Sequence, residues 1–193
     1  VYGDGDDIVL SQVQNPSYLP AGESYASSLT FTVPQGLAGD YRLLVHTDTG
    51  NAVIEDAGEG NNLGVSELTR FTLTPPPDLR VASVQAPAQA FSGQAMALTW
   101  TVANAGAGRT LQTQWSDRVF VSTDEFLDAS DIELGRFAHS GALEADGAYT
   151  VTHDVRLPIG SVGPRWFFVV TDFANQVYEH ASENNNQGMD ATP

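Results

Sequence analysis

The sequence predicts an all-β protein made of immunoglobulin-like β-sandwich modules in tandem, and three observations support this prediction. Apolar and polar residues alternate along the strand-like segments, and no segment has the period of an amphipathic helix. Asn, Gly and Pro separate these segments, as in an all-β domain. About seven short strands fit in each full unit, which is the number typical of an immunoglobulin-like sandwich of ~100 residues.

A further observation, an internal repeat, supports the tandem arrangement. Asp7-Ile8-Val9-Leu10 returns 124 residues later as Asp131-Ile132-Glu133-Leu134. The same offset pairs Thr47-Asp48 with Thr171-Asp172, and it holds without a gap from Asp4 to Gly64. Self-similarity at a fixed period is typical of proteins that string identical folded units together.

The repeat sets the expected domain boundaries. Residues 1–74 match only the C-terminal half of a unit, residues 75–77 form a stiff proline linker, and residues 78–193 form a second unit whose last strand is short or missing. A half sandwich exposes sheet edges and apolar faces. Two explanations stay open: the chain is a fragment of a longer protein, or strands from neighbouring chains complete each half in a filament.

The individual strands follow from alternation. In the first unit the expected strands are 25–33, with Tyr25, Leu29, Phe31 and Val33 on one face, and a final strand around Phe71 and Leu73. In the second unit they include 98–102, 119–121 and 149–157. Trp166 to Thr171 is apolar on both faces, which predicts a strand in the centre of its sheet.

The composition argues against several kinds of function. The chain has no Cys and no Lys, which excludes disulfides, thiolate nucleophiles, Schiff bases and Walker-type phosphate loops. A net charge of −16 repels phosphate backbones, so we expect no nucleic-acid partner, and it attracts hard cations such as Ca²⁺. No apolar run is long enough to insert into a membrane. None of the four histidines recurs in the repeat, and no nucleophile elbow is present, so we expect no enzymatic activity.

Several motifs together resemble the CARDB family, the cell-adhesion-related domain found in bacteria. They begin with Pro77-Asp78-Leu79-Arg80-Val81 and Leu98-Thr99-Trp100-Thr101-Val102, and they end with Thr171-Asp172, Asn175, Val177, Glu179 and Glu183-Asn184-Asn185. The resemblance covers nearly all of residues 77–186. It implies a non-catalytic immunoglobulin-like module, repeated in large bacterial proteins that are secreted or displayed at the cell surface.

Two acidic clusters are candidate Ca²⁺ sites, because closely spaced carboxylate and amide oxygens are the ligands that calcium prefers. One comprises Asp124, Asp128 and Asp131, with Asp4, Asp6 and Asp7 as its partial copy. The other comprises Asp172, Asn175, Glu179, Glu183 and Asn185, and its copy is Asp48, Asn51, Glu55, Glu59 and Asn61. Turn formation explains the Asp and Asn residues equally well. The recurring Glu residues favour an ion, or a salt bridge to Arg.

The leading functional prediction is an extender rod stiffened by Ca²⁺, whose partners are neighbouring repeats of the same protein or other chains in a polymer. The alternative is a carbohydrate- or protein-binding module. Trp115 and Phe126 are expected near loops, where aromatic rings could stack on a ligand. Trp115 has a second interpretation as a lid over one end of the sandwich.

Overall fold

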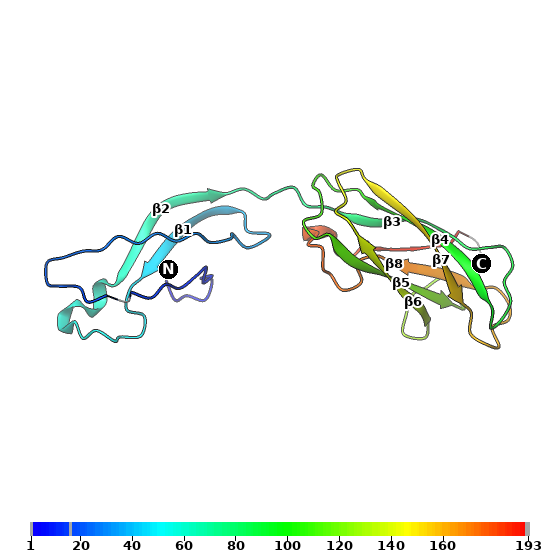
Figure 1. The fold of residues 1–193 in the computed structure, drawn as a ribbon, viewed down its shortest axis with the longest axis horizontal. Helices are drawn as coiled ribbons and strands as arrows, with labels where there is room; N and C mark the ends of the chain where they lie inside the picture. Colours follow the sequence, from blue (N-terminus) through cyan, green and yellow to red (C-terminus); the bar gives the residue numbers. More distant parts are fainter. Residues whose placement is uncertain (1, 16, 192–193) are drawn as a thin grey trace. The chain divides into compact units, whose positions relative to one another are not determined.

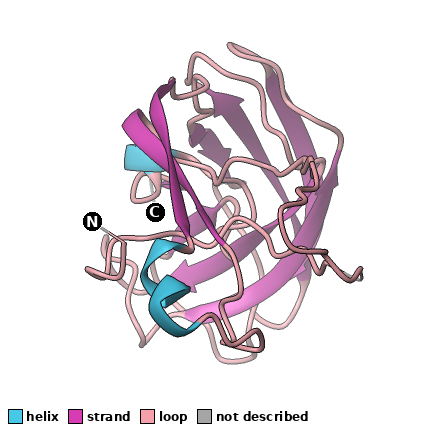
Figure 2. Cartoon of the chain, turned by 90° about the vertical axis from the view of Figure 1, so that its left-hand side faces the viewer, coloured by secondary structure: helices cyan, strands magenta, loops and turns pink. Residues whose placement is uncertain are grey.

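The computed structural model describes residues 2–15 and 17–191 and divides into two compact units, Val1–Leu73 and Thr74–Pro193 (Figure 1). Val1, Pro16, Thr192 and Pro193 lie outside the described residues, so the outermost ends of the expected domains are not described. In the described residues, helical structure is confined to two short 3-10 segments, η1 (Asp56–Asn61) and η2 (His180–Ser182), and the remainder is strand and loop (Figure 2). In the described part of the chain, no helix is long and apolar enough to cross a membrane.

The second unit contains two antiparallel sheets, as the alternation predicts. One sheet has the order β3-β4-β7 and the other β6-β5-β8-β9. Their bounds are β3 Leu79–Gln85, β4 Ala95–Asn104, β5 Gln114–Ser122, β6 Ile132–Ser140, β7 Ala148–Arg156, β8 Trp166–Val170 and β9 Gln187–Met189. The apolar strand β8 lies between β5 and β9, which confirms its expected central place.

The hydrophobic core lies between these two sheets. On β4, Leu98, Trp100 and Val102 are fully buried, and they pack in one cluster with Val119 of β5 and Val169 of β8. The intervening Thr99 and Thr101 face outward, where their hydroxyls bond to threonines of β7. A two-residue period therefore sorts the side chains of this unit into core and surface.

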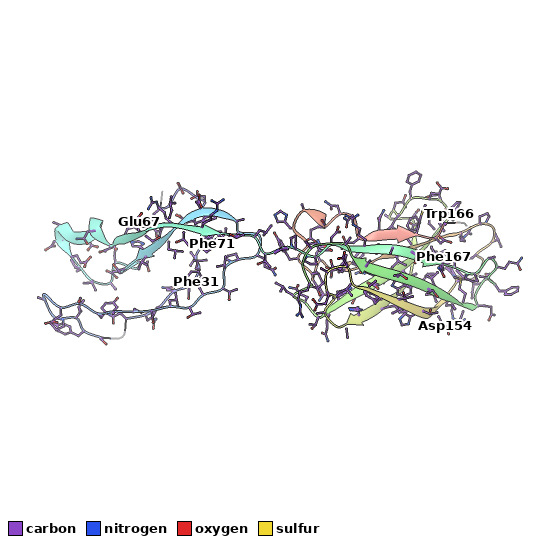
Figure 3. The ribbon with its side chains drawn as sticks, turned by 90° about the horizontal axis from the view of Figure 1, so that it is seen from above. Phe31, Glu67, Phe71, Asp154, Trp166 and Phe167 are labelled. Atoms are coloured by element: carbon purple, nitrogen blue, oxygen red, sulfur yellow. The ribbon has the colours of Figure 1, made fainter. Side chains whose placement is uncertain are left out.

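The first unit has one short hairpin, in which β1 (Gly39–His46) pairs with β2 (Leu63–Phe71). No described residue of this unit is fully buried. The expected strand at 25–33 was wrong: the segment is extended but forms no strand pairing, and Tyr25 and Leu29 are exposed. Figure 3 shows Phe31 on this segment and Phe71 on β2.

A missing neighbour explains the difference. The counterpart of segment 25–33 is β7, which obtains all its ladder hydrogen bonds from β4. Among the described residues, the first unit contains no strand that corresponds to β4. Alternation alone cannot make a strand, because an extended segment without a partner leaves its backbone groups unpaired.

The proline run packs against the body of the second unit. The Pro76 carbonyl accepts the Gly108 N–H at 3.1 Å, and the Asp78 carbonyl accepts the Ala105 N–H at 2.7 Å. A Cβ on Gly108 would overlap the Pro75 carbonyl, so the approach requires glycine. The chain therefore enters β3 along a fixed path.

Candidate functional site

The second predicted cluster begins in the turn that follows β8. Asp172 and Asn175 adopt left-handed φ angles of 43° and 49°, which Asp and Asn tolerate better than other side chains. The Asp172 carboxylate accepts the backbone N–H groups of Gln176 at 2.9 Å and Val177 at 2.8 Å. Asp172 is buried, and burial raises the pKa of its carboxyl. The turn is therefore shaped by the left-handed backbone of both residues and by the hydrogen bonds that the Asp172 carboxylate accepts from the backbone.

Glu179 is the most unusual residue of the cluster, since its side chain is fully buried. One carboxylate oxygen accepts the N–H of Leu79 at the start of β3, and the other accepts the side-chain amide of Asn186. Burial raises the pKa of Glu179 to about 7, and the charges of Glu183 and Asp172 push in the same direction. The carboxylate thus ties the C-terminal loop to the first strand of the unit.

Asp78 forms the other side of this junction. Its Oδ1 accepts Asn185 Nδ2 at 3.0 Å, and its Oδ2 lies 2.6 Å from the Arg80 guanidinium. The Asp78 backbone N–H donates to Oδ1 of Asn104, a fully buried side chain that also binds three carbonyls through its amide nitrogen. We call the set Asp78, Asn104, Glu179, Glu183, Asn185 and Asn186 the β3 junction.

Three oxygens of the β3 junction have no hydrogen-bond partner although they are buried. They are Oε2 of Glu183, Oδ1 of Asn185 and Oδ1 of Asn186. Asn186 is 7% exposed, and its Nδ2 is already used by Glu179. An unsatisfied buried oxygen costs about 1–3 kcal/mol. A hard cation would relieve this penalty, because carboxylate and amide oxygens are calcium's preferred donors.

The copy of this loop in the first unit has the same local geometry. The Asp48 carboxylate accepts the N–H groups of Ala52 and Val53, and Glu59 accepts that of Glu55, as the residues 124 positions later do. Asp48 and Asn51 have φ angles of 45° and 46°. Here Asn51, Glu55, Glu59 and Asn61 are exposed, and no described residue of this unit donates to the Glu55 carboxylate as Leu79 does to that of Glu179.

The first predicted cluster lies on the loop between β5 and β6, where its carboxylates bind their own loop. Asp124 accepts the N–H of Phe126, Asp128 accepts both the N–H and the hydroxyl of Ser130, and Asp131 accepts the N–H of Asp128. The hydrogen bonds from Ser130 lower the pKa of Asp128. These are the local bonds by which Asp residues form turns.

Among the described residues, one set of three carboxylates lies close enough together to bind a single ion. It is Asp4, Asp6 and Asp7, whose ligand atoms lie within 4.8 Å of one another on the exposed surface. The structure therefore does not gather Asp124, Asp128 and Asp131 in this way. In the β3 junction the unpartnered oxygens include the amide oxygens of Asn185 and Asn186, of which sequence spacing had proposed only Asn185.

Sequence reasoning missed three residues of the β3 junction: Asp78, Asn104 and Asn186. Asp78 lies 94 residues before Asp172, so no spacing within one loop could connect it to the cluster. Asn186 could have been included in the predicted cluster, since Asn62 occupies the matching position in the repeat. Nothing in the sequence connects Asn104 to the cluster.

The aromatic side chains require one correction. Trp115 is 1% exposed and donates its indole N–H to the Tyr149 hydroxyl, so the interpretation as an exposed ligand platform was wrong. Its side chain points inward from β5 and stacks on the His139 ring, with 4.1 Å between the ring centroids. Phe126 is exposed on the β5–β6 loop, as expected.

A buried polar network lies beside Trp115. The Asp117 carboxylate accepts the Trp100 indole N–H at 2.7 Å and the Tyr149 hydroxyl at 2.9 Å. Burial raises the pKa of Asp117. His153 is half-buried and stacks on Phe137. Since these groups bond to one another, they tie β4, β5 and β7 together across the core.

Comparison with known families identifies the fold of the second unit. The CARDB family model matches residues 76–189, which is more than half of the chain. The chain belongs to the CARDB family. CARDB is a non-catalytic domain family, which agrees with the absence of a recognisable catalytic motif in the sequence.

Two solved CARDB structures from Pyrococcus furiosus are similar to the chain. One is a crystal structure of a CARDB domain in complex with di-metal ions, with 19% identity, a TM-score of 0.44, and coverage of 61% of this chain and 93% of its own. The other is a solution NMR structure of that domain, with 18% identity, a TM-score of 0.43, and coverage of 60% and 93%. Comparison with curated proteins gave no match.

Proposed function

We propose that the chain is a non-catalytic extender segment of a bacterial protein that is secreted or displayed at the cell surface. In this proposal its CARDB units are immunoglobulin-like modules in tandem, their partners are neighbouring repeats, and Ca²⁺ stiffens them. The observation that carries the proposal is the set of three unsatisfied buried oxygens in the β3 junction.

The tandem arrangement is supported by the two copies of the acidic loop. Their left-handed residues coincide at the offset of 124, with Asp48, Asn51 and Asp56 matching Asp172, Asn175 and His180. The strands on either side of the loop also pair in the same register in both units. Val45 of β1 pairs with Gly64 of β2, and Val169 of β8 pairs with Gly188 of β9. Two segments with the same turns and the same pairing suit a rod made of one repeated unit.

The proposed role of Ca²⁺ follows from where the orphaned oxygens lie. Leu79 begins β3 directly after the proline run, and the buried carboxylate of Glu179 holds its N–H. An ion bound by Glu183, Asn185 and Asn186 would neutralise charge around this contact. The chain leaving the proline run would then be fixed more firmly to the body of the second unit.

Calorimetric titration and thermal melting with Ca²⁺ or chelator test this proposal. An ion that binds only the folded form, at a hundred times its Kd, adds about 2.7 kcal/mol to the free energy of unfolding. Glu183→Gln should remove most of this gain. Glu144→Gln, which changes an exposed acid paired with Arg109, should leave it intact. Identical melting curves in Ca²⁺ and in chelator would contradict the proposal.

Assembly with other chains is a second candidate, favoured by the one edge of β1 that has no partner strand among the described residues. Its counterpart β8 pairs with strands on both sides, whereas β1 pairs only with β2. A strand equivalent to β5 would fill the free edge, supplied by an earlier part of a longer protein or by a neighbouring chain. Sedimentation over a range of concentrations distinguishes these sources, because only a neighbouring chain produces concentration-dependent polymers.

A further inference from the structure

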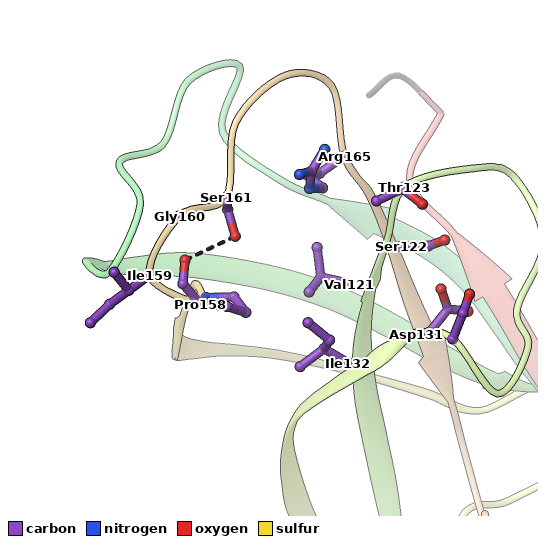
Figure 4. Close-up of a pocket in the computed structure, with 11 residues that line it drawn as sticks. Val121, Ser122, Thr123, Asp131, Ile132, Pro158, Ile159, Gly160, Ser161 and Arg165 are labelled. Atoms are coloured by element: carbon purple, nitrogen blue, oxygen red, sulfur yellow. Dashed lines mark hydrogen bonds between the residues drawn. The ribbon is translucent and has the colours of Figure 1, made fainter.

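A pocket at the far end of the second unit, away from the β3 junction, has the composition of a ligand site. It measures about 220 Å³ and lies among the end of β5, the β5–β6 loop and the β7–β8 loop (Figure 4). Apolar side chains of Val121, Ile132 and Pro158 form its floor, and Ser161 and Arg165 border it. An apolar floor with a few polar groups at the edge is the usual composition of a small-molecule site.

Arg165 is the distinctive residue of this pocket. Among the described residues it forms no ion pair with a carboxylate, although the protein has a net charge of −16 and most of its other arginines are paired. Its Nη1 donates to the Pro164 carbonyl at 2.7 Å, which leaves the other N–H groups of the guanidinium available. The planar guanidinium matches a carboxylate in a two-point hydrogen bond.

The rest of the pocket presents hydroxyl and carboxylate groups. Thr123, Asp131 and Ser161 line it with Arg165, and Figure 4 shows Arg165 above Val121 and Asp131 to the right of it. Asp131 uses one oxygen to accept the Asp128 N–H, so its other oxygen can accept a hydroxyl proton. A cationic group, an anionic acceptor and apolar side chains that line one pocket match a sugar ring that carries one carboxylate.

The pocket is not a requirement of the repeated fold. The position that matches Arg165 in the first unit holds Tyr41, and the one that matches Ser161 holds Leu37, whereas Pro158 and Gly160 match Pro34 and Gly36. The turn residues thus recur and the polar groups do not. This difference separates the residues that shape the loop from those that would contact a ligand.

We propose that this pocket binds a small carboxylate-bearing saccharide of the uronic-acid type, with its carboxylate on Arg165 and a hydroxyl on Asp131. The inference goes beyond the extender role, since an extender needs no ligand. It also does not depend on Ca²⁺ at the β3 junction, so the two proposals fail separately.

The test is an NMR titration of the full chain with glucuronate, its neutral methyl ester and an acetylated dipeptide with a free C-terminal carboxylate. We expect glucuronate to shift the amide signals of Val121, Ile132 and Gly160 with millimolar affinity. The ester should bind about tenfold more weakly, because it lacks the charge that Arg165 recognises. Equal binding of the ester, or no shift with glucuronate up to about 50 mM, overturns the proposal. Equal binding of the dipeptide overturns the assignment to a saccharide.

Two variants locate the interaction. Arg165→Gln should weaken glucuronate binding about tenfold or more while leaving the weak binding of the ester unchanged. Arg156→Gln is the matched control, because Arg156 also donates to a backbone carbonyl, that of Gly93, but lies outside the pocket lining. Equal glucuronate affinity in the two variants contradicts the proposal. If Arg165→Gln fails to fold, the comparison of glucuronate with its ester on the unchanged protein still shows whether the pocket recognises the carboxylate.

Discussion

Replacing the buried Glu179 by Gln tests the electrostatics of the β3 junction directly. The pKa of Glu179 is raised from 4.5 to about 7, so the folded state holds a proton that the unfolded state has released between these values. Stability therefore decreases as the pH rises through this window. A difference of this size corresponds to roughly 3 kcal/mol in the free energy of unfolding.

Glutamine should fit the site without increasing the number of unpaired groups. Its carbonyl oxygen can accept the Leu79 N–H, and its NH₂ can face Asn186 once that amide turns its unpartnered Oδ1 inward. In chelator, the free energy of unfolding of Glu179→Gln should decrease by about 3 kcal/mol less than that of the wild type between pH 4.5 and pH 8. The variant should consequently be more stable than the wild type at pH 8.

Urea denaturation at a series of pH values measures this difference. Burial also raises the pKa of Asp117 and Asp190, which adds a pH dependence of the same sign to both proteins and cancels in the comparison. Glu144→Gln serves as the control for loss of one exposed negative charge. Parallel pH profiles for Glu179→Gln and the wild type would refute the reasoning.

Three further substitutions test the fold. Asp117→Asn should cost about 1–3 kcal/mol in urea denaturation, because its amide group would face one of two buried donors; unchanged stability would mean that this network contributes nothing. Gly108→Ala should destabilise by about 1–3 kcal/mol, since the added Cβ overlaps Pro75; a neutral effect would show that the proline run can move away. Leu98→Ala should cost about 2–5 kcal/mol, whereas Leu68→Ala, which is 60% exposed, should change stability by less than about 0.5 kcal/mol; similar effects would contradict a core confined to the second unit.

The sequence predicted the strands of the second unit because alternation is a local property. Leu98, Trp100 and Val102 share a face by spacing alone, and all three are buried. The apolar β8 was expected at the centre of a sheet for a similar reason: both of its faces need cover. At 25–33 the alternation predicted a strand that does not form, because a strand there depends on a neighbouring strand.

The candidate site was predictable only as far as its loop extends. The turn formed by Asp172 and Asn175 follows from residues a few positions apart. The burial of Glu179 depends on Leu79, which lies 100 positions away, and no spacing rule reaches that far. Trp115 shows the converse error, since proximity to a loop in the sequence suggested exposure while the inward register of β5 decided its burial.

The two copies of the acidic loop separate turn formation from ion binding, because they share one feature and differ in another. The carboxylates of Asp48 and Asp172 cap equivalent backbone groups, so these bonds belong to the turn. Buried oxygens without partners occur, among the described residues, only in the copy that packs against β3. The number of ions should therefore follow the number of β3 junctions.

We accordingly expect calcium titration of this chain to give one dominant site. Glu183→Gln should abolish it, and Glu59→Gln at the matching position should leave it unchanged, since Glu59 is exposed and its loop has no β3 to close over it. Isothermal calorimetry with both variants measures the number of ions bound. Two equivalent sites, or equal losses in the two variants, would mean that the loop alone binds the ion and that burial against β3 is irrelevant.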